Sequence, residues 1–240
     1  MNPCLPTDQL TCYIVRHGER IDHIDDTWAI TSATPYDPPL TADGWAQARE
    51  AGSMIRDLEP QADSDYLVLV SPFLRCAQTA QAIHEGFHKG EGAQWRVALE
   101  PGLSEVINEN YFHSADNVPT GIAAERRDQL GRGDVCGNMG FDNEYCPAQA
   151  ELPAFPESFQ SMLARFTAVL DHVAARANGG MGGKRAVVVL VTHGAGITAL
   201  RWATTRRLEG SNDVPYCALF KATLDRGAAW TASTLLSPNL

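Results

Sequence analysis

Continuous apolar runs alternate along this chain with stretches in which apolar positions recur at helical spacing. The continuous runs are typical of strands buried on both faces of a sheet, and they cover 11–16, 66–70 and 186–191, with a short strand at 96–99. Helical spacing predicts helices over 41–58, 73–88, 157–177 and 195–206. Two β-rich stretches, 216–223 and 229–235, follow. This alternation predicts an α/β fold with a mostly parallel central sheet flanked by helices.

Two of the predicted helices carry clear local signals. Thr41 precedes the first one and is expected to be its N-cap. In 157–177 the apolar side chains share one face, and they are Phe159, Met162, Leu163, Phe166, Val169, Leu170 and Val173.

Two long segments, 21–39 and 106–155, show no regular period. They are too long to be ordinary connections, so we expect irregular insertions over a functional site. Their aromatic residues are interpreted as anchors that hold the loops to the core, with a pocket for an aryl or steroid group as the alternative. Residues 178–183 are predicted to be a linker, and the whole chain, 1–240, is predicted to be one domain.

Histidines follow two of the predicted buried strands. Arg16-His17 ends the first strand, His193 ends the run at 186–191, and Ser71-Pro72 ends the run at 66–70. In open parallel sheets, ligands bind beyond the carboxyl ends of the strands. We therefore expect both histidines at the same edge of the sheet.

Composition narrows the function classes. The formal net charge of −10 argues against nonspecific binding to nucleic acid or to anionic membranes. No apolar run approaches the roughly 20 residues of a membrane span, and the first residues do not resemble a secretory signal. The six cysteines lack close paired spacing, which favours reduced thiols in a cytosolic or nuclear compartment.

A cationic cluster is predicted around the first histidine. Three arginines, Arg16, Arg20 and Arg75, together with His193, are expected to bind the oxygens of a phosphate group. His17 is the candidate nucleophile, because arginine neighbours oppose its protonation and leave a neutral imidazole.

Glu105 is the candidate general acid for the leaving oxygen, with Glu100 and Glu109 as rivals. The arginines favour its ionised form, whereas a bound phosphate dianion favours its protonated form. Because arginines supply the positive charge, neither metal nor cofactor is expected. Cys76, next to Arg75, is interpreted as a small buried residue, with a redox-sensitive thiol as the alternative.

Four motifs together resemble the histidine phosphatase, or phosphoglycerate-mutase-like, superfamily. They are Arg16-His17-Gly18-Glu19, Ser71-Pro72-x-x-Arg75-x-x-x-Thr79-Ala80, Leu103-Ser104-Glu105 and Thr192-His193-Gly194. The resemblance covers about 12–235 and implies a three-layer sandwich with insertions over the active site. It also implies the same six site residues, with His17 forming a phosphohistidine and His193 acting in catalysis as well as in phosphate binding.

A narrower resemblance is to the branch that contains the suppressor-of-T-cell-receptor-signalling and ecdysteroid-phosphate phosphatases. It rests on Arg20-Ile21-Asp22, Pro38-Pro39-Leu40-Thr41, Leu74–Ala80, Glu100–Leu103 and Val214-Pro215-Tyr216. This branch implies an acid-type or protein-tyrosine-like phosphatase acting on a phosphorylated small molecule or a phosphoprotein. The analogy is compatible with a homodimer. The branch also includes a subunit of an RNA polymerase III initiation factor.

Two other functions stay open. A phosphoglycerate-type mutase would use the same nucleophile, although Arg20-Ile21-Asp22 departs from the Ser-x-Trp-Asn typical of mutases. A phosphatase-fold subunit of a multiprotein complex would keep the fold for assembly.

Two motif matches are interpreted as coincidental. His84-Glu85-Gly86-Phe87-His88 matches a zinc-protease pattern, but Gly86 interrupts its helix. The segment 178–185 resembles a phosphate-binding loop, but it precedes a strand rather than a helix.

Overall fold

The computed structural model describes residues 9–59, 65–87, 94–178, 186–206, 214–225, 229–232 and 236. Within these ranges, seven strands form a single sheet in the order β4-β3-β2-β5-β1-β6-β7. The strands are β1 (Gln9–Arg16), β2 (Asp65–Val70), β3 (Trp95–Leu99), β4 (Gly140–Phe141), β5 (Ala186–Thr192), β6 (Leu219–Asp225) and β7 (Trp230–Ala232).

Five of the strands run parallel, as the sequence predicted. Parallel pairing joins β4 to β3, β3 to β2, β2 to β5 and β5 to β1. The β-rich stretches near the end of the chain add an antiparallel edge, because β6 pairs with β1 and β7 pairs with β6.

The register of the central strands brings their carboxyl ends together. Arg16 of β1 lies opposite Thr192 of β5, and Val70 of β2 lies opposite Val191. The residues that follow these positions, His17, Ser71 and His193, therefore emerge at one edge of the sheet. The strands are buried almost throughout, which explains their continuous apolar sequence.

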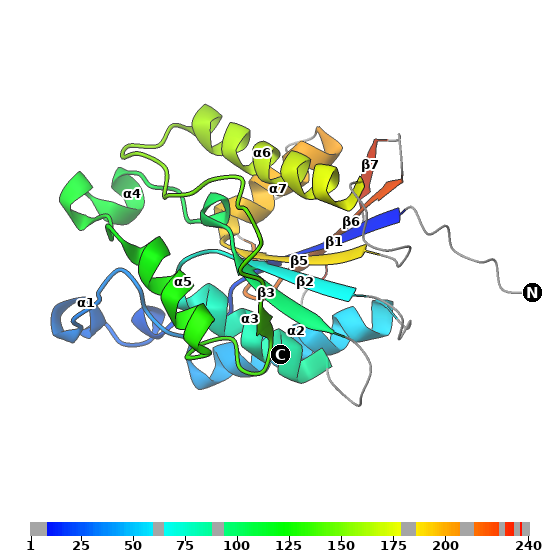
Figure 1. Ribbon diagram of the computed structural model, residues 1–240. Coiled ribbons are helices and arrows are strands. Elements are labelled where there is room, and N and C mark those ends of the chain that lie inside the picture. Colours follow the sequence, from blue (N-terminus) through cyan, green and yellow to red (C-terminus); the bar gives the residue numbers. More distant parts are fainter. Residues whose placement is uncertain are drawn as a thin grey trace, which may run out of the picture.

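Helices cover both faces of the sheet and give three layers (Figure 1). Helices α2 (Ala42–Leu58) and α3 (Leu74–Phe87) pack against one face. Helices α6 (Phe159–Asn178) and α7 (Gly194–Thr205) pack against the other. The predicted N-cap is confirmed, since the Thr41 hydroxyl accepts a hydrogen bond from the Gly44 amide at 2.9 Å. The apolar face predicted for 157–177 is not buried along its whole length, because Phe159, in the first turn of α6, is 49% exposed.

Glycines allow α2 to approach its neighbours backbone to backbone. A Cβ atom on Gly44 would lie 2.2 Å from the Glu19 carbonyl oxygen, and one on Gly18 would lie 2.4 Å from the Gly44 carbonyl oxygen. Farther along α2, a Cβ on Gly52 would lie 2.1 Å from the Ile83 carbonyl oxygen. Real Cβ atoms are not found at such distances, so these contacts require glycine.

The two insertions contain more secondary structure than the sequence indicated. The first holds η1 (Ile21–His23) and α1 (Trp28–Thr31). After η2 (Pro101–Leu103), the second holds α4 (Glu109–Phe112), η3 (Ala115–Asn117) and α5 (Ile122–Arg132), as well as β4. The expectation of a wholly irregular second insertion is therefore wrong, because α5 has three turns. Its N-cap and C-cap are glycines with left-handed backbone, Gly121 and Gly133, and they resemble loop signals in the sequence.

A small apolar cluster joins the insertions to the edge of the sheet. It consists of Phe73, Ile107, Phe112 and Ile122, and Tyr36 from the first insertion packs against it. The Tyr36 and Phe112 ring centroids are 5.8 Å apart. These aromatic residues thus anchor loops, as the sequence analysis favoured. In the part of the chain that the structure describes, no helix has the length and apolarity to cross a membrane.

Candidate active site

The two histidines that follow β1 and β5 lie side by side at the edge of the sheet. Their ring centroids are 5.3 Å apart, and the His17 amide donates to the Thr192 carbonyl at 2.9 Å. Both side chains are almost completely buried. Parallel pairing of β1 with β5 is therefore what brings residues 176 positions apart into one site.

His17 is held with one ring nitrogen turned away from its own backbone. Its Nδ1 lies 2.8 Å from the Gly18 carbonyl oxygen. A carbonyl can only accept, so Nδ1 carries the proton and Nε2 keeps a lone pair. Burial lowers the pKa of His17 well below its usual value, and the charge of Arg75 lowers it further, with smaller effects from Arg16 and Arg20. The ring is therefore neutral at pH 7, as a nucleophile requires.

Arg75 extends from α3 beneath the two histidines. Its side chain is buried, and Nη2 donates to His193 Nδ1 at 3.2 Å. The Nε and Nη1 groups of Arg75 are also buried, and they have no hydrogen-bond partner among the residues that the structure describes. Buried donors of a charged group are normally paired, so these N–H groups are suited to binding an anion.

Thr79 connects Arg75 to the loop that carries His17. Its hydroxyl donates to the Arg75 carbonyl at 2.7 Å and accepts from the Gly18 amide at 3.0 Å. This hydroxyl thus fixes the start of α3 against the loop after β1.

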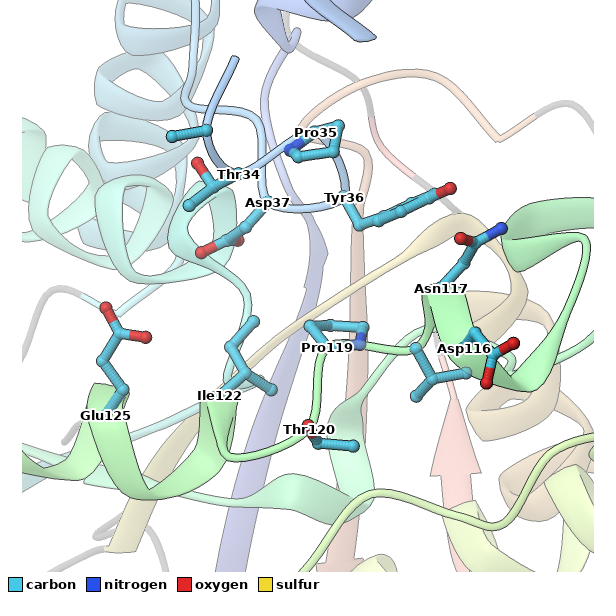
Figure 2. Close-up of a pocket in the computed structure, with 12 residues that line it drawn as sticks. Thr34, Pro35, Tyr36, Asp37, Asp116, Asn117, Pro119, Thr120, Ile122 and Glu125 are labelled. Atoms are coloured by element: carbon cyan, nitrogen blue, oxygen red, sulfur yellow. The ribbon is translucent and has the colours of Figure 1, made fainter. Parts of the chain in front are cut away.

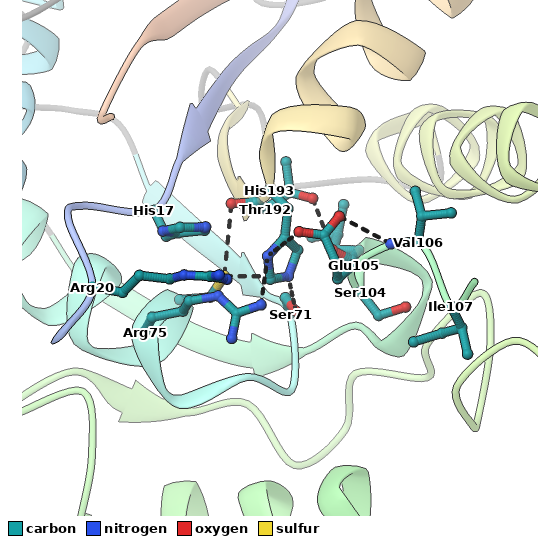
Figure 3. Close-up of polar contacts among 12 residues, drawn as sticks. His17, Arg20, Ser71, Arg75, Ser104, Glu105, Val106, Ile107, Thr192 and His193 are labelled. Atoms are coloured by element: carbon teal, nitrogen blue, oxygen red, sulfur yellow. Dashed lines mark hydrogen bonds and ion pairs between the residues drawn. The ribbon is translucent and has the colours of Figure 1, made fainter. Parts of the chain in front are cut away.

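Arg16 and Arg20 complete the cationic side of the site. The Arg16 guanidinium lies over the Tyr216 ring, 4.3 Å from its centroid, and donates to the Val214 carbonyl. Arg20 forms an ion pair with Asp22 at 2.9 Å. Figure 3 shows the Arg20 and Arg75 side chains directed toward the space between His17 and His193.

Glu105 lies on the other side of this space. Its Oε1 accepts from the Val106 amide at 3.0 Å, and its Oε2 lies 3.5 Å from His193 Nδ1. The rival Glu100 is fully buried and accepts from the Tyr145 hydroxyl at 2.8 Å and from the Ala148 amide at 2.7 Å, so it supports the insertion instead. The other rival, Glu109, begins α4.

A buried arginine supports the segment that carries Glu105. Arg165 of α6 donates to the carbonyls of Gly102 at 2.8 Å and Ser104 at 3.1 Å. Its charge is balanced by Glu157 at 2.7 Å, and both side chains are almost completely buried.

Ser71 fixes the orientation of His193. Because the Arg75 guanidinium can only donate, His193 Nδ1 must accept, and the proton of the neutral ring resides on Nε2. That nitrogen lies 2.8 Å from the Ser71 hydroxyl and 3.6 Å from the Cys76 sulfur. Burial, followed by the charge of Arg75, lowers the pKa of His193 well below its usual value. The sequence placed Ser71 at a strand end and in a family motif, but its contact with His193 was not predicted.

The structure brings the six predicted residues to one site: Arg16, His17, Arg20, Arg75, Glu105 and His193. The zinc-type motif does not contribute to it. The His84 ring packs against Trp95 at 5.4 Å, and Glu85 pairs with Arg49 at 3.4 Å. His88 and residues 179–185 of the second motif lie outside the described residues. Among the residues described, no group of three or more His, Cys, Asp or Glu side chains is arranged to hold a metal ion.

Comparison with known proteins agrees with this arrangement. The family model of the histidine phosphatase superfamily (branch 1) matches residues 12–130. Ubiquitin-associated and SH3 domain-containing protein A of Homo sapiens is 29% identical over 212 residues, which are 76% of this chain and 29% of that protein. A 2,3-bisphosphoglycerate-dependent phosphoglycerate mutase of Rhizobium etli is 30% identical over 116 residues, which are 48% of this chain and 49% of that protein.

A solved structure extends the likeness to the whole fold. The ecdysone phosphate phosphatase from Bombix mori, in complex with tungstate, superposes with a TM-score of 0.66 at 22% identity, covering 96% of this chain and 94% of that one.

The chain belongs to the histidine phosphatase superfamily, and its relatives include phosphatases and mutases. Its fold is the α/β fold of phosphoglycerate-mutase-like proteins. The chain spans less than a third of the human relative and about half of the Rhizobium etli mutase.

Proposed function

We propose that this protein is a metal-independent phosphomonoester hydrolase that acts through a phosphohistidine at His17. The observation that carries the proposal is the pairing of a neutral His17, whose Nε2 keeps its lone pair, with buried Arg75 donors that have no partner in the described part of the chain. Phosphoryl transfer depends mainly on positioning and on stabilisation of charge, and this site supplies both without a metal.

The first step forms the P–Nε2 bond at His17 and breaks the P–O bond to the leaving group. Arg16, Arg20 and Arg75 hold the non-reacting phosphate oxygens, and Glu105 donates a proton to the leaving oxygen. The negative phosphate favours protonation of His193 Nδ1. Arg75 then turns its Nη2 from this nitrogen to the phosphate, and the Nδ1 N–H donates to a phosphate oxygen. In the second step, Glu105 removes a proton from water, which attacks phosphorus and releases phosphate and neutral His17.

Aromatic residues near the site favour an aryl phosphate, either a small molecule or a phosphotyrosine protein. The Tyr216 ring centroid lies 5.9 Å from that of His17, and Tyr111 is 46% exposed nearby on α4. Flat apolar groups pack well against such rings. This argument supports the protein-tyrosine-like subtype that the narrower resemblance implied.

A mutase is the second candidate, supported by the similarity to the Rhizobium etli enzyme. Mutases typically have Ser-x-Trp-Asn where this chain has Arg20-Ile21-Asp22, and here Arg20 and Asp22 form an ion pair. This difference weighs against a mutase. Conversion of 3- to 2-phosphoglycerate, primed by bisphosphoglycerate, would reverse this ranking.

The test is hydrolysis of p-nitrophenyl phosphate in excess EDTA. His17→Ala should lower kcat by at least about a thousandfold, because the nucleophile is lost. His113→Asn, at an exposed histidine outside the site, is the matched control and should retain wild-type activity. Intact-mass detection of a phosphoryl adduct in the wild type, absent in His17→Ala, checks the intermediate. If His17→Ala were as active as the His113→Asn control, the proposal would be refuted.

A further inference from the structure

A cavity of about 430 Å³ lies between the two insertions. One wall is formed by residues 33–37, and the facing wall by residues between 116 and 125, as Figure 2 shows. None of the six active-site residues lines it. Small-molecule pockets have volumes of roughly 300–1,000 Å³, so this cavity is large enough for a small organic group.

The walls of the cavity are partly apolar. Pro35 and Tyr36 face it from the first insertion, and Val118, Pro119 and Ile122 face it from the second. Such walls suit an aliphatic stem rather than a fully hydrated ion.

The charged groups of the cavity are all acidic. Asp37, Asp116 and Glu125 line it, and none of the described Lys, Arg or His residues does. Asp116 has no polar partner among the described residues, and Glu125 accepts only from the uncharged Gln129 amide, at 3.2 Å. Asp37 is paired with Arg126 and also lies in the field of Arg75, so the three carboxylates and these two guanidiniums leave one net negative charge. A net negative cavity favours a cation.

Asp37 is the carboxylate best placed to sense a ligand. Its side chain is 14% exposed, and Arg126 lies 2.5 Å away. Burial raises the pKa of Asp37 in spite of this partner, so a second positive group nearby would stabilise its ionised form.

The same pair holds the turn that carries Ser71 and Arg75. The Leu74 amide donates to Asp37 at 2.6 Å, and Arg126 Nε donates to the Pro72 carbonyl at 2.8 Å. A group that approaches Asp37 therefore acts on two hydrogen bonds that position this turn. These two hydrogen bonds are the structural route by which occupancy of the cavity would affect the phosphate site.

We infer that the cavity binds an ammonium or guanidinium group on an apolar stem, as in a lysine or arginine side chain, and that its occupancy is coupled to the phosphate site through Asp37 and Arg126. The cation is either part of the phosphorylated substrate or a separate small molecule. Both sources present the same chemistry to the cavity.

Binding is tested on the full chain with N-acetyl-arginine amide, and the uncharged N-acetyl-citrulline amide serves as the matched ligand. Amide chemical shifts of Tyr36 and Ile122 should change saturably with the arginine probe. The citrulline probe should bind at least about fivefold more weakly, since it lacks the charge. The double variant Asp116→Asn/Glu125→Gln should weaken the arginine probe by a similar factor, and its two exposed sites leave folding intact.

The control variant is Asp128→Asn. It removes an exposed charge from α5, the helix that carries Glu125, but Asp128 does not line the cavity. It should bind like the wild type. Equal affinity for both probes, or unchanged affinity in the double variant, would overturn the inference. This readout needs no turnover, so it stands apart from a failure of the proposed phosphatase activity.

Kinetics then distinguish the two sources of the cation. If it belongs to the substrate, a phosphotyrosine peptide with a neighbouring arginine should have a higher kcat/KM than its citrulline counterpart, and the double variant should lose this preference. If it is separate, N-acetyl-arginine amide should change p-nitrophenyl phosphate hydrolysis in the wild type but not in the double variant. Binding with neither effect would overturn the proposed coupling.

Discussion

Replacing Ser71 with alanine tests whether the orientation of His193 is set by one hydroxyl. Ser71 and His193 are both fully buried, and their Oγ and Nε2 atoms are 2.8 Å apart. Arg75 occupies the other ring nitrogen. Ser71→Ala therefore leaves the N–H of a fully buried ring without its oxygen acceptor.

An unpaired buried donor costs about 1–3 kcal/mol. This free energy corresponds to a loss of about 5- to 150-fold in kcat/KM if the histidine must keep its orientation to bind phosphate. The Cys76 sulfur lies 3.6 Å from the same nitrogen and is a weak acceptor. We therefore expect a loss toward the lower end of this range.

The assay is p-nitrophenyl phosphate hydrolysis combined with urea unfolding, because the free energy lost with the hydrogen bond can lower either kcat/KM or the free energy of unfolding. Nitrogen chemical shifts of His193 report its tautomer directly. Cys76→Ala is the control, since it removes the sulfur but keeps the hydroxyl, and its kcat/KM should stay within about twofold of the wild type. The reasoning would be refuted if Ser71→Ala had the same kcat/KM, the same free energy of unfolding and the same His193 tautomer as the wild type.

Three further predictions concern stability. Because the pKa values of His17 and His193 are lowered on folding, the unfolded chain binds more protons below about pH 6.5. Stability should therefore fall with acidification, by up to about 1.4 kcal/mol per pH unit for each histidine; a free energy of unfolding that is flat from pH 6.5 to 5 would contradict this. Gly44→Ala should destabilise by about 1–3 kcal/mol through overpacking, whereas Gly131→Ala, with its nearest neighbour atom 3.9 Å from the new Cβ, should be neutral or stabilising; equal melting temperatures would count against the glycine contact. Arg165→Met should cost about 3–5 kcal/mol in urea unfolding, because its buried carboxylate partner loses its counter-charge; neutralising that partner as well should recover part of the loss, and a single-variant cost below about 1 kcal/mol would argue against the buried pair.

The parts of the fold that could be predicted are those in which local pattern and tertiary environment agree. The apolar runs before His17 and His193 are buried on both faces, so their composition alone reveals them as parallel strands. Their parallel direction was predicted because helices separate them along the chain, whereas their order in the sheet was not. The six residues of the proposed site could be named because they follow strand ends or belong to family motifs.

The parts that could not be predicted depend on contacts between distant segments. Helix α5 is capped by glycines and carries only a few buried apolar residues, so its sequence resembles a loop. Phe159 matches the helical period but lies one turn beyond the region where α6 meets the sheet. The hydrogen bond from His193 to Ser71 depends on the registers of β2 and β5, which no local pattern encodes.

The close contact between Gly18 and Gly44 separates the molecule into a part that resists change and a part that tolerates it. Backbone atoms of α2 lie against the loop after β1, with no side chain between them to adjust. A new side chain there would displace His17, whereas the insertions reach the site through side chains that can be exchanged. Changes in the insertions can therefore alter what reaches the site, while the pairing of the two histidines at the edge of the sheet is left unchanged.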